Sequence, residues 1–407
     1  MSPIAITAQF SVLQRKWGKS TVLRPRLISI GHLLSGNGGN AVIMAVSTVI
    51  AARALGPAAY GVLALVLTIG RVSERVLRFE SWQPLIRFAA QRDVENDPSR
   101  MSALMLYGLL LDIVSALLAA LLTVVAGYAL AGLIHLKPSA MPLVAIYALA
   151  IAVNVRGMPT AALRINGNFK TLAYVQFFAS VLRVVLALGA LALRLDLLAF
   201  VVIWTVAQII DSTVFNYLGF RTLRRLGIPS PLRANWRGLS RQFPGFLSFA
   251  FSTNLSSTLR TFTQEADTLL VSAFAGSNAA GFYHIAKRIA KVAQQIGAMI
   301  QAVIYPDMAK MWANAQHVAF RKITARVQLA LAVTGLGLLG GAWVFGAFFV
   351  DVAFGKDFAA AYPLMLAQLM AVVLIMHAAP SRSALLAMNR PRFVLCLLYT
   401  SPSPRDS

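Results

Sequence analysis

Residues 103–126, ALMLYGLLLDIVSALLAALLTVVA, contain a single ionisable side chain, that of Asp112. A helix of about 20 such residues crosses the roughly 30 Å hydrocarbon core of a bilayer. Similar apolar runs recur from Leu27 onward in this chain of 407 residues, of which 58% are hydrophobic and 13% charged. Soluble domains use about 45–50% apolar and 25% charged residues. The sequence therefore predicts an all-α integral membrane protein with many spans.

The apolar runs between polar breaks predict ten membrane spans. These are residues 27–52, 61–86, 103–126, 141–163, 172–193, 197–220, 243–273, 281–305, 327–350 and 359–386. The longest connection, 221–242, is rich in arginine and leaves six spans before it and four after it. We therefore predict two helical lobes around a central cavity. The expected parts are a basic N-terminal arm at 1–26, a six-helix lobe at 27–222, a linker at 223–241, an incomplete lobe at 242–395 and a non-native tail at 396–407.

The distribution of basic residues predicts the orientation of the spans. Short loops rich in Lys and Arg stay on the cytoplasmic side of the membrane. With the N-terminus inside, the inner connections hold 23 Lys and Arg and the outer connections hold four. The net charge of +23 thus follows from topology, and no nucleic acid is expected as a partner. We predict a multi-pass protein of the bacterial inner membrane with a cytoplasmic N-terminus.

An internal repeat supports the division into two lobes. LGPAAYG at 55–61 matches AGSNAAG at 275–281, with Gly56 and Gly276 lying 220 residues apart, as do Gly61 and Gly281. Farther on, ALRINGNF at 162–169 resembles LLAMNRPRF at 385–393. Because an even number of spans separates the copies, the repeats are expected to run in the same direction, related by an axis along the membrane normal.

Basic residues inside two spans predict a binding cavity for an anion. Spacings of i, i+3, i+4 and i+7 put side chains on one helical face, and both spans show them. The second span carries Arg71, Glu74, Arg75 and Arg78, and the eighth carries His284, Lys287, Arg288 and Lys291. Arg71 and Lys291 are 220 residues apart, and both are expected about 15 Å below the outer surface. With Arg260, these cations would bind a phosphate or pyrophosphate group, for which guanidinium is well suited. The alternative is that they pair with acids or extend to the membrane surface.

Acidic residues and glycines inside the spans suggest further roles. Glu74, Asp112, Asp211 and Asp267 would couple an ion to transport or serve as counter-ions to the arginines. Gly36, Gly38 and Gly39 in the first span would form a hinge, or else allow close packing against another helix. Cys396 is the one cysteine, and no two of the five histidines have metal-ligand spacing. We therefore expect no metal, no cofactor and no catalytic residue.

Four stretches resemble a known family. They are TVIAARALGPAAYGVLAL at 48–65, PTAALRINGNFKTLAYV at 159–175, ADTLLVSAFAGSNAAGFYHIAKRI at 266–289 and YPDMAKMWA at 305–313. They resemble the polysaccharide transporter branch of the MOP exporter superfamily, the flippases for O-antigen of lipopolysaccharide and for exopolysaccharide. Members have twelve to fourteen helices in two six-helix lobes, so the resemblance implies that this chain is truncated at its C-terminus. Asp267 matches the Asp of the family's D-x-L-L-V-type motif, for which the resemblance implies a structural role.

The resemblance implies a function as well as a fold. A cavity open to the cytoplasm would take the head group of an undecaprenyl-pyrophosphate-linked oligosaccharide and reopen outward, while the lipid tail stays among membrane lipids. A polysaccharide polymerase and glycosyltransferases would be partners. A lipid II exporter or a multidrug exporter of the same superfamily is the alternative, although a cationic cavity repels cationic drugs. A membrane glycosyltransferase or polymerase would need a long outer loop with ionisable residues, whereas 126–140 offers only His135 and Lys137. The chain is thus predicted not to be an enzyme.

Overall fold

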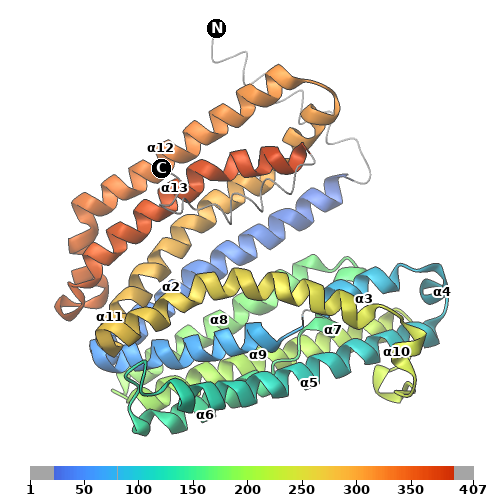
Figure 1. Cartoon of the computed structure of the whole chain (residues 1–407), viewed down its shortest axis with the longest axis horizontal. Helices are drawn as coiled ribbons and strands as arrows, with labels where there is room; N and C mark the ends of the chain where they lie inside the picture. The colour runs from blue at the N-terminus through green and yellow to red at the C-terminus, as the bar shows by residue number, and fades with distance from the viewer. Residues whose placement is uncertain (1–22, 80, 389–407) are drawn as a thin grey trace, which may run out of the picture. The chain divides into compact units, whose positions relative to one another are not determined.

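The computed structural model describes residues 23–79 and 81–388, and every regular element in these two ranges is a helix (Figure 1). Within the helices, some side chains lie outside the description. They are those at 23–38, 41, 92, 173, 256–257, 259–264, 296, 298–307, 309–310, 313 and 386–387. The predicted all-α class is confirmed. Most of the predicted arm at 1–26 and the whole predicted tail at 396–407 lie outside the described residues.

Two helices are too long for a single membrane span. α2 (Leu23–Leu77) has 55 residues and α11 (Phe246–Ala313) has 68, whereas one crossing needs about 20. Each is interrupted at a glycine with non-helical backbone angles, Gly56 (φ 68°, ψ 174°) in α2 and Gly276 (φ 81°, ψ 177°) in α11. A positive φ is readily adopted by glycine because it lacks a Cβ atom. Each of these helices thus contains two of the predicted spans.

The other long helices coincide with predicted spans. They are α5 (Pro98–Leu130), α8 (Phe169–Ala192), α9 (Leu197–Arg225), α12 (His317–Phe354) and α13 (Ala361–Ala387). Shorter elements lie between them: α3 (Trp82–Ala89), α4 (Arg92–Glu95), α10 (Leu239–Gln242) and the 3-10 turns η1 (Pro138–Ala140), η2 (Pro231–Arg233) and η3 (Lys356–Phe358). Three of the long helices begin at a polar cap, since Asp97, Asn168 and Asp196 each accept a backbone N–H of the first turn. Such caps typically stabilise a helix by about 1 kcal/mol.

Two predicted spans differ from the observed helices. The second span was expected to continue to residue 86, but α2 ends at Leu77 and the chain is non-helical before α3. The fourth span, expected as one helix at 141–163, consists of α6 (Met141–Ala152) and α7 (Gly157–Ile165) with a break between them. The break has a local cause, because the ring of Pro159 would clash with the carbonyl of Val155 in a continuous helix.

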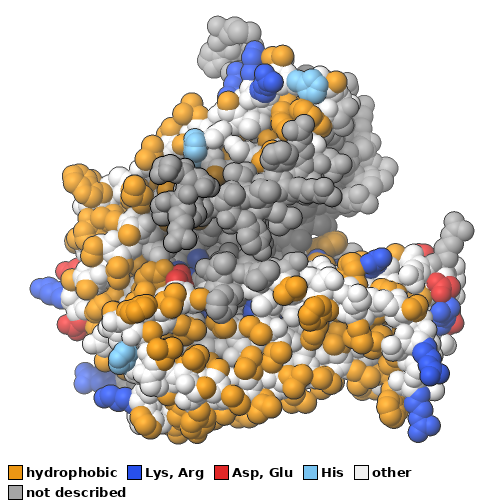
Figure 2. All heavy atoms as spheres, in the orientation of Figure 1, with side chains coloured by type: hydrophobic (Ala, Val, Ile, Leu, Met, Phe, Trp, Pro, Cys, Tyr) orange, Lys and Arg blue, Asp and Glu red, His pale blue; other side chains and the backbone are white. Residues whose placement is uncertain are grey.

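The described helices have the length and composition of membrane spans. Seven helices of the described part are long and apolar enough to cross a bilayer, among them α5, α9 and α12. α5 exposes large apolar side chains along its length, from Leu110 to Val125, with exposed fractions of 37–60%. Figure 2 shows hydrophobic side chains over the flank that carries α5 in Figure 1, with Lys and Arg gathered towards its ends. Since such a surface suits lipid and not water, the chain is an integral membrane protein.

Contacts divide the chain into two compact units. The first comprises Met1–Ile43 and Leu65–Phe274, and the second comprises Met44–Ala64 and Ala275–Ser407. α2 and α11 contribute to both units, so these boundaries differ from the predicted lobe boundary. The predicted linker, 223–241, belongs to the first unit. The division into lobes of six and four spans stays a prediction.

The core of the first unit includes the predicted linker. One apolar cluster joins Leu85 of α3, Leu104 of α5 and Met158 of α7 to Leu239 and Phe243. In the second unit, Phe320 of α12 packs with Met308 and Ala384. The linker is therefore fixed against the helices of its unit by buried apolar side chains.

The two copies of the first repeat meet inside the second unit. A Cβ atom at Gly61 would lie 2.0 Å from the carbonyl oxygen of Ser277, and one at Gly281 would lie 3.1 Å from the carbonyl oxygen of Pro57. Because 57 corresponds to 277 and 61 to 281, these contacts are reciprocal, as across a twofold axis. The matching angles of Gly56 and Gly276 show the same equivalence. The second sequence match ends in residues outside the description.

Candidate functional site

The break between α6 and α7 lies well inside a membrane span, about 18 Å along the chain from the start of α6. Two of its carbonyl groups accept side chains of α9: the Ser212 hydroxyl donates to the carbonyl of Val153 (2.7 Å), and the Asn216 amide donates to that of Val155 (2.8 Å). Non-helical backbone at membrane depth is tolerated only where it is buried in protein or lines a cavity. Many transporters build their binding sites at such interrupted helices.

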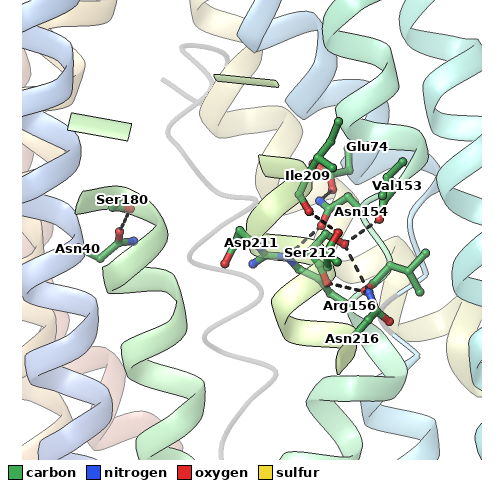
Figure 3. Close-up of polar contacts among 12 residues, drawn as sticks. Asn40, Glu74, Val153, Asn154, Arg156, Ser180, Ile209, Asp211, Ser212 and Asn216 are labelled. Carbon is green, nitrogen blue, oxygen red and sulfur yellow. Dashed lines mark hydrogen bonds and ion pairs between the residues drawn. The ribbon is translucent and has the colours of Figure 1, made fainter. Parts of the chain in front are cut away.

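A chain of charged and polar side chains crosses this break (Figure 3). The Arg78 guanidinium donates a hydrogen bond to the Glu74 carboxylate at 2.5 Å, and the Asn154 amide donates to the same carboxylate. Arg156 donates from Nε to the Asn154 side chain at 2.9 Å and forms an ion pair with Asp211. The network therefore links α2, the break and α9 within the first unit.

Asp112 of α5 contacts the start of α7, the helix that follows the break. Its carboxylate accepts the backbone N–H of Met158 at 2.8 Å, at the N-terminus of α7, and the residue is 5% exposed. A carboxylate is favourable there because of the partial positive charge of the helix end. A Cβ atom at Gly157 would lie 1.9 Å from the Ser81 hydroxyl and 2.4 Å from an Asp112 carboxylate oxygen. Glycine at 157 thus permits this close approach.

Arg71 is joined to α11. Its guanidinium lies 3.4 Å from the Glu265 carboxylate and donates to the Thr68 hydroxyl at 3.0 Å. The Arg71 side chain is 27% exposed and that of Glu265 is 7% exposed. The carbonyl of Arg75 accepts the Thr258 hydroxyl at 2.8 Å, so α11 also binds the last turn of α2.

The predicted basic residues of the eighth span lie in the second unit. Lys287 is 7% exposed, while Arg288 and Lys291 are half-buried. One turn before Lys287, His284 is hydrogen-bonded to the Tyr60 hydroxyl at 2.7 Å. The predicted approach of Arg71 and Lys291 at mid-depth stays a prediction. The side chain of Arg260 lies outside the description.

The remaining predicted residues have local contacts. The Asp267 carboxylate accepts the neighbouring Thr268 N–H at 2.7 Å. α2 is helical through Gly36, Gly38 and Gly39 and is interrupted at Gly56 instead. A Cβ atom at Gly39 would lie 3.1 Å from the Phe177 ring of α8, so this glycine packs closely on a neighbouring helix. The surroundings of Gly36 and Gly38 lie outside the description, and their role as a hinge stays a prediction.

The structure assembles part of the predicted set and adds residues to it. Arg78, Glu74, Asp211 and Asp112 meet at the break, as ionisable residues of apolar spans often do. Asn154, Arg156 and Glu265 belong to the same unit. Arg156 and Glu265 are ionisable residues of predicted spans, whereas Asn154 is new to the candidate set. The combination of Gly157 with Pro159 inside an apolar run is the signal that would have indicated Asn154 and Arg156. Among the described residues, no three His, Cys, Asp or Glu side chains lie close enough together to hold a metal ion.

Comparison with known proteins gives one family and several relatives. A family model described as "Polysaccharide biosynthesis protein" matches residues 50–363. The inner membrane protein YghQ of Escherichia coli K12 is 24% identical over 357 residues, which cover 86% of this chain and 98% of the relative. The teichuronic acid biosynthesis protein TuaB of Bacillus subtilis 168 is 25% identical over 226 residues, which cover 55% of this chain and 44% of TuaB.

Two solved structures share the fold. A multidrug resistance MATE family transporter of the MOP superfamily, in an inward-facing conformation, matches with a TM-score of 0.57 and 14% identity, over 86% of this chain and 83% of that one. A mutant form of the MATE transporter VcmN of Vibrio cholerae matches with a TM-score of 0.53 and 11% identity, over 90% of this chain and 86% of that one. At these identities the likeness shows the fold alone.

Proposed function

Because the chain belongs to the polysaccharide biosynthesis protein family, we propose that it exports an undecaprenyl-pyrophosphate-linked oligosaccharide, an O-antigen or exopolysaccharide unit, by alternating access. The predicted membership of a polysaccharide family is confirmed by the family match, and the predicted fold is shared with two MATE transporters. On this proposal the protein is a transporter and not an enzyme. It lies in the bacterial inner membrane with its N-terminus in the cytoplasm.

One observation carries the substrate class: both units hold basic residues one helical turn apart inside apolar helices. The first unit contributes Arg71, Arg75 and Arg78, and the second contributes Lys287, Arg288 and Lys291. Burying cations in a membrane protein is costly, and such residues usually mark substrate or ion pathways. A pyrophosphate group is the matching ligand, because guanidinium and ammonium groups form charge-assisted hydrogen bonds to phosphate oxygens.

The acids at the break serve as counter-ions in this proposal. Glu74 and Asp211 each bind an arginine, and Asp112 binds the start of α7. They would thus hold the end of α2, α5, α7 and α9 together as one group during transport. Glycosyltransferases that make the lipid-linked unit and a polymerase that consumes it would be the partners.

The name of TuaB supports export of a polysaccharide precursor over export of drugs. The multidrug transporters share only the fold with this chain. A cavity lined by cations would also repel the organic cations that many such exporters carry. Lipid II carries the same undecaprenyl pyrophosphate, but growth depends on its export. A bacterium that grows without the exported glycan therefore separates the two substrates.

The test is complementation of a strain that lacks this protein. We expect Arg71→Ala and Lys291→Ala each to abolish surface glycan while the protein remains in the membrane at normal levels. The matched controls, Lys137→Ala and Arg194→Ala, each remove one exposed cation at a helix end and should export normally. Full export by both Arg71→Ala and Lys291→Ala would overturn the assignment of the cationic residues.

A further inference from the structure

The connection between α9 and α11 carries a dense positive charge. We call residues 221–241 the arginine segment. It contains six arginines and no acidic residue, and all six side chains are exposed: Arg221, Arg224, Arg225, Arg233, Arg237 and Arg241. In Figure 2, basic side chains gather at the end of the molecule where Figure 1 shows α10. Six exposed arginines, with no acid among residues 221–241, form a surface that attracts anions.

Buried apolar side chains fix the arginine segment to the helices of its unit. Leu223, Pro231 and Leu239 are buried, and Leu239 lies in the cluster that contains Leu85 and Leu104. The segment also begins within α9, a candidate membrane span, and ends five residues before α11, which begins with an apolar stretch and contains the predicted span 243–273. It therefore lies at the level where these helices leave the bilayer, and its arginines are displayed from a fixed backbone.

Two large apolar side chains are exposed among the arginines. Leu232 is 68% exposed and Trp236 is 67% exposed, and the Arg237 guanidinium lies 5.8 Å from the centre of the Trp236 ring. Exposed leucine and tryptophan are unfavourable in water, but tryptophan is enriched where a membrane meets water. A leucine and a tryptophan beside basic residues are the pattern of segments that bind the membrane surface.

We propose that the arginine segment is a binding site for anionic phospholipids, with Arg233 and Arg237 on the headgroup phosphates and Leu232 and Trp236 inserted among the acyl chains. An anionic lipid surface satisfies both the charges and the apolar side chains, whereas a soluble acidic protein would satisfy only the charges. This site is independent of the proposed transport substrate, because it requires only the bilayer in which the chain resides.

Lipid binding by the full chain tests the charged half of the site. The purified protein is titrated with phosphatidylglycerol or phosphatidylcholine in detergent, and bound lipid is counted by native mass spectrometry. Each arginine near the lipid is expected to contribute about a fivefold gain in affinity. Arg233→Gln with Arg237→Gln should therefore weaken phosphatidylglycerol binding more than about tenfold, with phosphatidylcholine binding unchanged.

The matched control is Lys137→Gln with Arg194→Gln, which removes two exposed cations of the same unit at the other end of its helices. We expect this variant to bind phosphatidylglycerol as the wild type does. Circular dichroism and thermal unfolding show whether both variants are folded. An equal loss in the two variants, or no loss in either, would overturn the proposal.

Quenching of tryptophan fluorescence by brominated lipid tests whether Trp236 is inserted among the acyl chains. The protein is reconstituted with phosphatidylglycerol brominated in its acyl chains, and tryptophan fluorescence is compared between the wild type and Trp236→Phe. We expect the wild type to show a quenched component that Trp236→Phe lacks. If that component is instead quenched by aqueous iodide and not by the brominated lipid, Trp236 faces water and the proposal is overturned.

Discussion

At the scale of single residues, Arg71 presents the clearest test of what the membrane cations do. It was predicted to bind the substrate, and the structure gives it a partner, Glu265, at 3.4 Å. Arg71 could either neutralise the buried Glu265 or bind the anionic substrate. Replacing Arg71 alone would abolish export in both cases and so would not separate the two roles. Removing one member of a buried pair leaves an uncompensated charge, which is strongly destabilising.

The paired replacement separates the two roles. We expect Arg71→Ala to reach the membrane at normal levels but to unfold at a lower temperature and not to export. Arg71→Ala with Glu265→Gln should regain the melting temperature without regaining export. The measurements are thermal unfolding in detergent and surface glycan in a complemented strain. If the double variant exports as well as the wild type does, Arg71 serves only as the counter-ion of Glu265.

Gly157 is a second residue with a specific consequence. A methyl group there would overlap Ser81 and Asp112, at 1.9 and 2.4 Å. We expect Gly157→Ala to destabilise the protein by about 1–3 kcal/mol, as over-packing of buried sites does. In Gly189→Ala, the added Cβ would meet no atom within 4 Å, so this control should be neutral or stabilising by about 0.4–1 kcal/mol. Equal melting temperatures for the two variants would show that Asp112 is not packed against α7.

At the scale of elements, the spans could be predicted and the break between α6 and α7 could not. Apolar length alone indicates a span, because a bilayer sets the number of residues that each helix needs. Pro159 lies in the first turn of α7, just after the break, whereas Pro380 lies inside α13, which is continuous through it. Proline is therefore insufficient to decide a break. The partners that stabilise the broken backbone, Ser212, Asn216 and Asp112, come from other spans.

The residues of the candidate site could likewise be predicted only in part from the sequence. Glu74, Asp112 and Asp211 could be selected because charges in apolar runs are rare. Arg78 could be selected on the same ground, but the pairing of Asp211 with Arg156 could not be predicted, since it depends on how helices pack. Asn154 is uncharged, so its own side chain does not mark it in the sequence, although it connects Glu74 with Arg156.

The reciprocal packing of the two repeats gives an element-scale prediction. At Gly61 an added Cβ would lie 2.0 Å from a backbone oxygen, which cannot move aside, whereas at Gly281 the nearest atom is 3.1 Å away. We expect Gly61→Ala to lower the melting temperature clearly and Gly281→Ala to lower it less. Gly337→Ala in α12, where no atom lies within 4 Å, is the control. A larger effect at Gly281 would contradict the observed packing.

At the scale of the whole molecule, the distribution of basic residues predicts which ends of the helices face the cytoplasm. Ala58 and Asn278 are exposed residues of connections predicted to face outward. Arg225 and Lys322 are exposed residues of connections predicted to face the cytoplasm. In a Cys396→Ser background, single cysteines at the first two positions should react with an impermeant reagent added to whole cells. Cysteines at the other two should react only after the membrane is opened, and the reverse pattern would invert the topology.

The central claim is that this membrane protein moves a lipid-linked anionic glycan. It rests on the family match, on the shared fold and on the basic residues that both units carry inside apolar helices. An anionic head group and a cationic drug make opposite demands on such residues. Transport by the purified protein therefore discriminates between the two kinds of exporter.

The most direct measurement uses proteoliposomes that contain the full chain and an undecaprenyl-pyrophosphate-linked oligosaccharide placed in one leaflet. Movement is followed as the fraction of sugar that becomes accessible to an oxidant confined to the other side. We predict rapid movement with the wild type and none with Arg71→Ala or with protein-free vesicles. Failure of the wild type to move the glycan, together with uptake of an organic cation by the same vesicles, would contradict the account.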